Sequence, residues 1–143
     1  MQLVKGSVLD VANQNNVSIA ETFMSVDAVI LVDVSGSMSE KDTRNGESRY
    51  QVALNELAKL QEELPGKIAV AGFSDHARFA VSGVPKFEQG MTDIVKALEF
   101  VKRVDGCDIK IILISDGEPN DEGQTLKLAR TFESKIDTVF VGK

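Results

Sequence analysis

The residues best suited to chemistry are Asp33, Ser35 and Ser37, which follow the apolar run from Val26 to Val32. They place one carboxylate and two hydroxyls on alternate residues, where a buried strand is expected to give way to a loop. Alternate residues of an extended segment project to the same side, so these three side chains can converge on one point. Hard oxygen donors suit a small hard cation such as Mg²⁺. Taken alone the pattern is weak, because Asp and Ser follow many strands simply to satisfy backbone groups.

Two later segments strengthen the case for a metal site. Gly90-Met91-Thr92-Asp93 precedes a helical pattern, and the apolar run from Ile109 to Ser115 ends in Asp116-Gly117-Glu118-Pro119. The chain thus has five oxygen-bearing residues in the order and element context of a metal-ion-dependent adhesion site: Asp33, Ser35, Ser37, Thr92 and Asp116. This site is the signature of the von Willebrand factor type A family. The chain resembles bacterial or phage-type members of that family over about residues 26 to 142.

The resemblance implies a role for each residue of this set. Ser35 and Ser37 would bind the cation through their hydroxyls, while Asp33 and Asp116 would bind directly or through water and orient neighbouring hydroxyls. Thr92 would be the variable ligand, direct in one state and water-mediated in another. Hydroxyls and waters leave the positive charge less quenched than carboxylates would, so an open coordination position attracts an Asp or Glu side chain from a partner protein. Mg²⁺ is the expected occupant and Mn²⁺ the alternative.

One position departs from the family pattern. Met91 stands where the family often has a second glycine before the threonine. A side chain there narrows the approach to the metal or adds an apolar contact, and it removes no ligand.

The ligating residues are expected to lie on exposed loops, so Asp33→Ala is expected to abolish metal-dependent binding and to leave the fold intact.

The elements that must position these residues are those of a doubly wound α/β domain. Four apolar runs predict strands, at 26–32, 68–73, 109–115 and 136–141, and a short antiparallel edge strand is expected at 78–81. Helical spacing of apolar residues predicts helices over 50–64, from near Thr92 and around 126–132. Strands alternating with helices favour a mostly parallel sheet with helices on both faces. Ligands bind at the carboxyl ends of strands in such sheets.

The resemblance also predicts the pairing and the ends of the domain. The first and fourth strands are neighbours in the family, which would bring Asp33 and Asp116 together. The family usually adds one more strand and a terminal helix, which are absent here, so the last strand is expected to be an exposed edge. Residues 1–25 are expected to form an N-terminal arm, either a hairpin or edge extension or a loosely held segment, before the type A domain of residues 26–143. That arm or a second protomer would cover the edge.

Composition excludes several classes of function. The net charge is −6, from 22 acidic and 16 basic residues, with no basic cluster, so nucleic-acid binding is disfavoured. The single cysteine, Cys107, cannot form an intrachain disulfide. No segment has the length of a membrane span or the order of a signal peptide, so no membrane contact and a cytoplasmic location are expected. His76 lacks a second His or a Cys at ligand spacing, which disfavours zinc.

The leading hypothesis is a non-enzymatic, metal-dependent protein-binding module. An enzyme is the first rival, because Mg²⁺ flanked by Asp33 and Asp116 could support phosphoryl transfer. Against it, the metal loops have no Lys or Arg, no glycine-rich phosphate cradle is present, and the only histidine is His76. A scaffold subunit of a chelatase or stress-response complex, with or without a working site, is the second rival.

Overall fold

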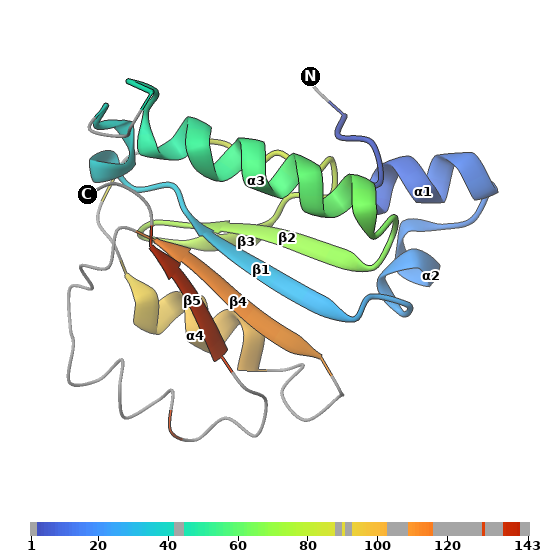
Figure 1. The fold of residues 1–143 in the computed structure, drawn as a ribbon. Helices are drawn as coiled ribbons and strands as arrows, with labels where there is room; N and C mark the ends of the chain where they lie inside the picture. The colour runs from blue at the N-terminus through green and yellow to red at the C-terminus, as the bar shows by residue number, and fades with distance from the viewer. Residues whose placement is uncertain are drawn as a thin grey trace.

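The computed structural model describes residues 3–41, 45–87, 90, 93–102, 109–115, 130 and 136–140. Its centre is a five-stranded sheet with strand order β3-β2-β1-β4-β5 (Figure 1). The strands are β1 (Ala28–Asp33), β2 (Ile68–Phe73), β3 (Ala77–Phe79), β4 (Lys110–Ser115) and β5 (Ile136–Phe140). β3 runs antiparallel to β2 at one edge, and the other pairings are parallel. The predicted mostly parallel sheet with an antiparallel edge strand is therefore confirmed.

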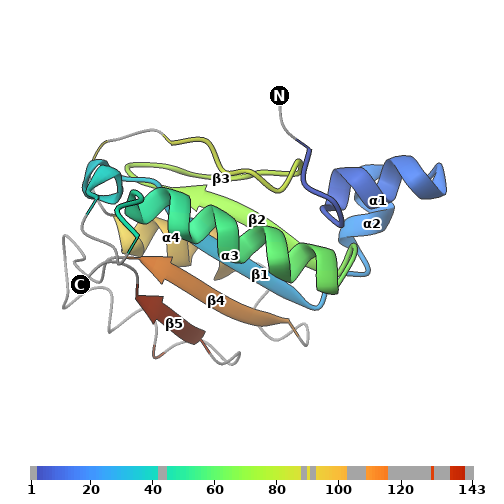
Figure 2. The same cartoon turned by 45° about the horizontal axis from the view of Figure 1, so that its top comes forward.

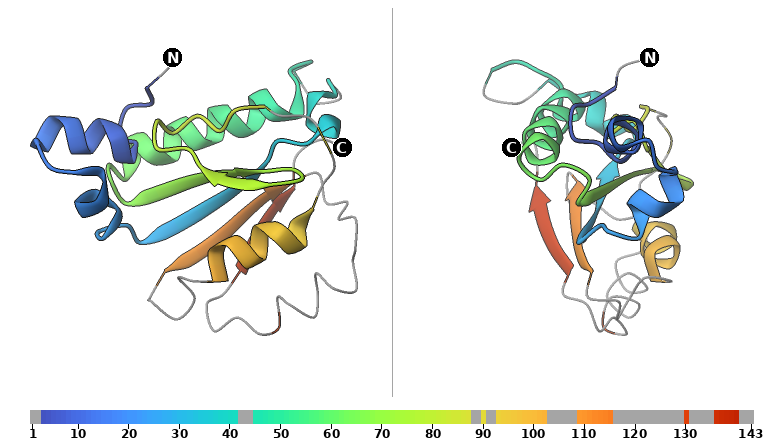
Figure 3. Two further views of the ribbon diagram at one scale, coloured as in Figure 1. Left: turned by 180° about the vertical axis from the view of Figure 1, so that it is seen from behind. Right: turned by 90° about the vertical axis from the view of Figure 1, so that its right-hand side faces the viewer.

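Both faces of the sheet are apolar and covered, as a doubly wound fold requires. On one face, Val29 and Leu31 of β1 pack with the buried side of α4 (Ile94–Val101). On the other face, Ile30 and Val32 pack with Ala53 and Leu57 of α3 (Arg49–Glu63). Figures 1 and 3 show α3 and α4 on opposite faces of the sheet. These helices confirm the predictions for 50–64 and for the segment after Thr92, while the helix predicted around 126–132 lies outside the described residues.

The strand order places a switch point at the carboxyl end of β1. The chain leaves β1 for β2 on one side and later reaches β4 on the other side. β1 and β4 pair in parallel with Val32 opposite Ile114, so Asp33 and Ser115 lie next to each other at the ends of their strands. The predicted neighbourhood of the first and fourth strands is confirmed. A crevice for a ligand is expected at such a position.

The N-terminal segment forms two helices, so the predictions of a strand hairpin and of a loosely held arm are wrong. α1 (Val8–Asn15) and α2 (Ile19–Phe23) begin after Ser7 and Ser18, whose hydroxyls accept the backbone N–H of Asp10 and Glu21. Serine caps of this kind stabilise helix starts that a short apolar pattern does not reveal.

These helices are fastened at the β3 side of the sheet, away from β5. The Val4 N–H donates to the Ser82 carbonyl and the Leu9 N–H to the Val81 carbonyl, each at 2.9 Å, and Val8 is buried in the core. Figures 1 and 2 place α1 and α2 at the end of the sheet opposite the 3₁₀ helix η1 (Gly36–Ser39). The prediction that this segment covers the last strand is therefore also wrong. Whether residues 26–143 fold as a separate domain stays a prediction.

After β3 the chain runs back along α3 toward η1 (Figure 3). This stretch, residues 80–87, is here named the return segment. The Gln61 side-chain amide donates to the Gly83 carbonyl at 3.2 Å, near the end of α3. At the start of α3, the Tyr50 hydroxyl donates to the Pro85 carbonyl at 2.5 Å, and its ring lies 5.4 Å from that of Phe87. Burial raises the pKa of Tyr50, which keeps its hydroxyl protonated as a donor. The return segment is thus fixed to both ends of α3.

Candidate metal centre

Asp33 ends β1 as a fully buried carboxylate whose two oxygens are both engaged. Its Oδ1 accepts the Ser35 backbone N–H at 2.9 Å and the Ser35 hydroxyl at 2.5 Å, while Oδ2 accepts the Ser115 hydroxyl at 2.8 Å. A buried charge is tolerated when hydrogen bonds replace its hydration. The expectation that the ligating residues lie on exposed loops is therefore wrong for Asp33, and also for Ser35, which is 1% exposed.

Ser35 and Ser37 stand at the entrance to η1, directly after β1. The two hydroxyl oxygens are 3.4 Å apart, and Ser35 Oγ also contacts the Asp33 carboxylate. Met38 is fully buried beneath this turn, in the layer that includes Val34 and α3. The structure thus brings together the three side chains that the alternating pattern predicted to converge.

These oxygens fit a small divalent cation. In an octahedron with metal–oxygen distances of about 2.1 Å, neighbouring ligand oxygens lie about 3 Å apart. The spacings of 2.5 and 3.4 Å in the Asp33–Ser35–Ser37 group bracket that value. No cluster of three or more His, Cys, Asp or Glu side chains within the described ranges could hold a metal. A site built there consequently depends on hydroxyls, as the sequence pattern implies.

Thr92 and Asp116 lie outside the described residues, as does Met91, but the structure describes Gly90 and Asp93 on the two sides of Thr92 and Ser115 before Asp116. The Gly90 carbonyl accepts the Gly36 N–H at 3.0 Å, and the Asp93 N–H donates to the Ser74 carbonyl at 3.1 Å. The segment that contains Thr92 therefore begins against the first metal loop and ends against the turn after β2. Ser115 directly precedes Asp116.

Gly90 is a residue that the sequence pattern contained but did not explain. Its φ of +84° is in the region that favours glycine, and a Cβ there would lie 2.8 Å from Asp75 Oδ2. The Ser74–Asp75 turn therefore packs against Gly90, two residues before Thr92. Only the tertiary contact reveals this.

Ser115 is the site residue that sequence reasoning missed. It is fully buried at the end of β4, and its hydroxyl fixes the rotation of the Asp33 carboxylate from the neighbouring strand. Its position at the end of an apolar run, just before Asp116, was visible. The bond to Asp33 was not, because it depends on the pairing of β1 with β4.

Ser115→Ala is expected to weaken Mg²⁺ binding by about 10–100-fold, the usual effect of losing a residue that orients a ligand. Calorimetric titration measures this, and Ser115→Thr, which keeps the hydroxyl, should restore most of the affinity. Ser39→Ala is the control, since Ser39 belongs to η1 but its exposed hydroxyl donates to the Gly36 carbonyl. Equal affinities for Ser115→Ala and the parent would exclude this positioning role.

Comparisons with known proteins bear on the fold. No family model matches this sequence, and no curated protein matches it. A solved structure that is similar belongs to an aerotolerance-related membrane protein from Bacteroides fragilis NCTC 9343 with multiple mutations to serines. The TM-score is 0.64 at 19% identity, over 82% of this chain and 68% of the other. In the described part of this chain, no helix combines the length and apolarity needed to cross a membrane.

At that identity the likeness is evidence for a common architecture alone. The chain therefore has an α/β fold with five mostly parallel strands, consistent with the von Willebrand factor type A fold that its sequence resembles.

Proposed function

We propose that this chain is a metal-dependent protein-binding module that captures an acidic side chain of a partner protein. The observation that carries the proposal is the convergence of Asp33, Ser35 and Ser37 at the switch point of the sheet, where Ser35 Oγ lies 2.5 Å from Asp33 Oδ1 and 3.4 Å from Ser37 Oγ. Thr92 and Asp116 are proposed to complete the ligand set from the loops after Gly90 and Ser115.

The charge balance of the site favours capture of an acid. When bound, Mg²⁺ or Mn²⁺ would supply a positive centre with an open position for an outside carboxylate. The Asp33 carboxylate accepts hydrogen bonds from the hydroxyls of Ser35 and Ser115, and these bonds hold both side chains in place. Ser35 and Ser37 present neutral oxygens. A donor set of this kind leaves the centre attractive to an acidic group, although the whole chain carries a net charge of −6.

A capture experiment tests the proposal. The immobilised chain is incubated with extract of its source cells in Mg²⁺ or in chelator, and the bound proteins are identified by mass spectrometry. Proteins retained by the parent only in Mg²⁺ are expected to be lost with the Ser35→Ala/Ser37→Ala double variant and kept with Ser39→Ala, the matched substitution in η1. The proposal would be contradicted if the same proteins were retained in Mg²⁺ and in chelator, and by the parent and the double variant alike.

Thr92→Ala separates binding of the metal from binding of the acid. Because Thr92 is proposed as the variable ligand, its loss is expected to weaken partner binding more than Mg²⁺ binding. Calorimetry with Mg²⁺, followed by binding of a captured partner, measures the two losses. Losses of equal size would contradict the proposed role of Thr92.

A non-enzymatic role is part of the proposal. Phosphatase assays with Mg²⁺ and Mn²⁺ are expected to give no activity above that of the Asp33→Ala variant. Turnover by the parent that is lost in this variant would favour the phosphoryl-transfer alternative instead.

A further inference from the structure

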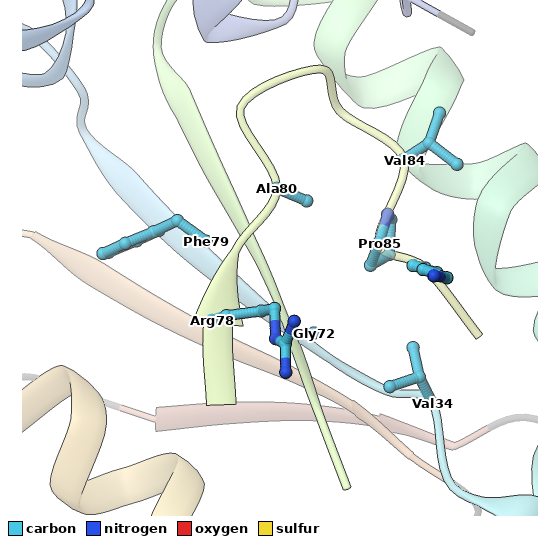
Figure 4. A pocket seen from close by; sticks show the side chains of 8 residues that line it. Val34, Gly72, Arg78, Phe79, Ala80, Val84 and Pro85 are labelled. Atoms are coloured by element: carbon cyan, nitrogen blue, oxygen red, sulfur yellow. The ribbon is translucent and has the colours of Figure 1, made fainter. Parts of the chain in front are cut away.

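A pocket of about 130 Å³ opens beside the first metal loop, between the sheet and the return segment. Val34 and Gly72 form its floor, Arg78 and Ala80 one side, and Val84 to Lys86 the other. Figure 4 shows Arg78 lying over Gly72, with Val84 and Pro85 across from it and Val34 nearby. An engineered apolar cavity of roughly 150 Å³ accepts benzene, so this pocket has room for one aliphatic side chain.

The close approach of the return segment to β2 beside this pocket requires a glycine at residue 72. Ile68 and Val70 of β2 pack into the layer under α3, and two residues further on Gly72 projects to the same face. A Cβ on Gly72 would lie 3.0 Å from Pro85 Cβ and 3.5 Å from a Val34 methyl. The Tyr50 hydroxyl donates to the Pro85 carbonyl, and the Ala80 N–H donates to the Val70 carbonyl at 2.7 Å, so the return segment is fixed to α3 and to β2 on either side of the pocket.

The described lining of the pocket contains two cationic side chains and no acidic one. Arg78 of β3 pairs with Gly72 in the sheet register, and Lys86 follows Pro85; both are exposed. In a chain of net charge −6, the exposed Lys86 ammonium favours an anionic group at the mouth of the pocket. Apolar walls together with a cationic rim suit an aliphatic side chain that has a carboxylate close to it.

The pocket and the candidate metal centre share a piece of backbone. Val34 lies between Asp33 and Ser35, and its N–H donates to the Phe73 carbonyl at 2.8 Å. Consecutive Cα atoms are about 3.8 Å apart, so Val34, which lines the pocket, is one residue from two candidate ligands. One extended segment of a partner protein can therefore contact both the pocket and the candidate metal centre. The return segment also leads to Gly90, whose carbonyl accepts the Gly36 N–H of the metal loop.

We propose that this pocket is a second contact for the partner segment whose acid binds the cation, and that it takes an aliphatic side chain with a neighbouring carboxylate held by Lys86. This inference rests on the proposed function for the identity of the segment. The chemistry of the pocket itself needs no cation, so the two can be tested apart.

The pocket is tested first in chelator, by NMR titration of the ¹⁵N-labelled chain with N-acetyl-leucine. Amide shifts are expected at Gly72, Ala80 and Lys86. N-acetylglycine, which lacks the aliphatic group, should bind about tenfold more weakly. N-acetyl-leucinamide, which lacks the carboxylate, should bind about two- to fivefold more weakly, as the loss of an exposed ion pair predicts. Equal binding of the three compounds, or shifts elsewhere only, would overturn the proposal.

Two variants and their controls locate the binding. Ala80→Leu fills the pocket and should abolish the shifts, whereas Ala58→Leu, which lines a separate hollow beside Leu3 and Glu62, should leave them unchanged. Lys86→Gln changes only an exposed side chain and should weaken binding as the amide probe does, and Lys110→Gln is its control. Unchanged binding in both Ala80→Leu and Lys86→Gln would overturn the assignment even if one variant folded poorly.

The link to the metal is tested with peptides that contain one Leu and one Asp separated by increasing numbers of glycines. At one spacing, in Mg²⁺, the Leu is expected to raise affinity about tenfold over a Gly-substituted peptide, and Ala80→Leu should remove that gain. Mg²⁺-dependent binding without a gain at any spacing overturns this inference and leaves the proposed function standing. N-acetyl-leucine binding without Mg²⁺-dependent peptide binding overturns the proposed function and the link to it, but not the pocket.

Discussion

Asp33→Ala is expected to abolish Mg²⁺ binding and, contrary to the expectation from sequence, to destabilise the fold. The substitution removes the carboxylate that orients Ser35 and Ser115. It also takes the Asp33 acceptor away from one buried backbone N–H and two buried hydroxyls, at a cost of about 1–3 kcal/mol for each group left unsatisfied. Calorimetric titration with Mg²⁺ measures the first effect, and urea unfolding in chelator measures the second without any contribution from the metal.

Asp27→Ala is the matched control for this experiment. Asp27 precedes β1 at its other end and is exposed, so its removal should change the free energy of unfolding by less than about 0.5 kcal/mol. Mg²⁺ titrations of this variant and the parent should coincide. If Asp33→Ala gave the same titration as the parent, the metal site would be wrongly assigned. If it lost binding without losing stability, the hydrogen bonds to Asp33 would not contribute to the fold.

Phe73→Ala is expected to lower the free energy of unfolding by about 3–5 kcal/mol, the usual cost of a large cavity. The ring is fully buried between the sheet and α4. Stability of a domain this size is commonly 5–15 kcal/mol, so the loss amounts to between about a fifth and the whole of it. Mg²⁺ affinity of the folded variant should change little, because the residue holds Val34 through its backbone carbonyl. Urea unfolding and calorimetry on the same sample measure both quantities.

Phe79→Ala is the control for burial. Phe79 lies on the short edge strand, is 40% exposed, and packs against Phe100 at a centroid distance of 4.8 Å. Its loss should cost clearly less than the loss of Phe73, since a partly exposed site leaves no closed cavity. Similar losses in the two variants would show that the layer under α4 is less tightly packed than the structure indicates.

The apolar runs of β1 and β2 were sufficient to predict the sheet. In both strands nearly every residue is buried, and such runs are typical of strands covered on both faces. The spacing of Asp33, Ser35 and Ser37 likewise predicted their convergence, although Ser37 reaches it from the 3₁₀ helix η1 and not from an extended segment.

Features that depend on contacts between distant segments were not predictable from the residues alone, and the pairing of β1 with β4 was expected only from the family resemblance. α1 and α2 are short, and their positions depend on serine caps and on backbone bonds to Val81 and Ser82. The burial of Asp33 and its bond to Ser115 depend on strand pairing. No periodicity in one sequence reveals such pairing.

Several expectations stay predictions. These are the identity of the cation, the acidic partner, the absence of enzymatic activity, pairing of copies through the β5 edge, and a cytoplasmic location. The parts played by Thr92 and Asp116 belong with them, since both residues lie outside the described ranges.

The burial of Asp33 has a consequence for the energetics of the whole chain. Asp33 is both part of the interior and a candidate ligand, so binding of the ion and folding of the chain are thermodynamically coupled. By mass action, an ion at about a hundred times its dissociation constant adds about 2.7 kcal/mol to the folded state. Depletion of the free ion would then release the partner and, in the same step, enlarge the unfolded population that proteases degrade.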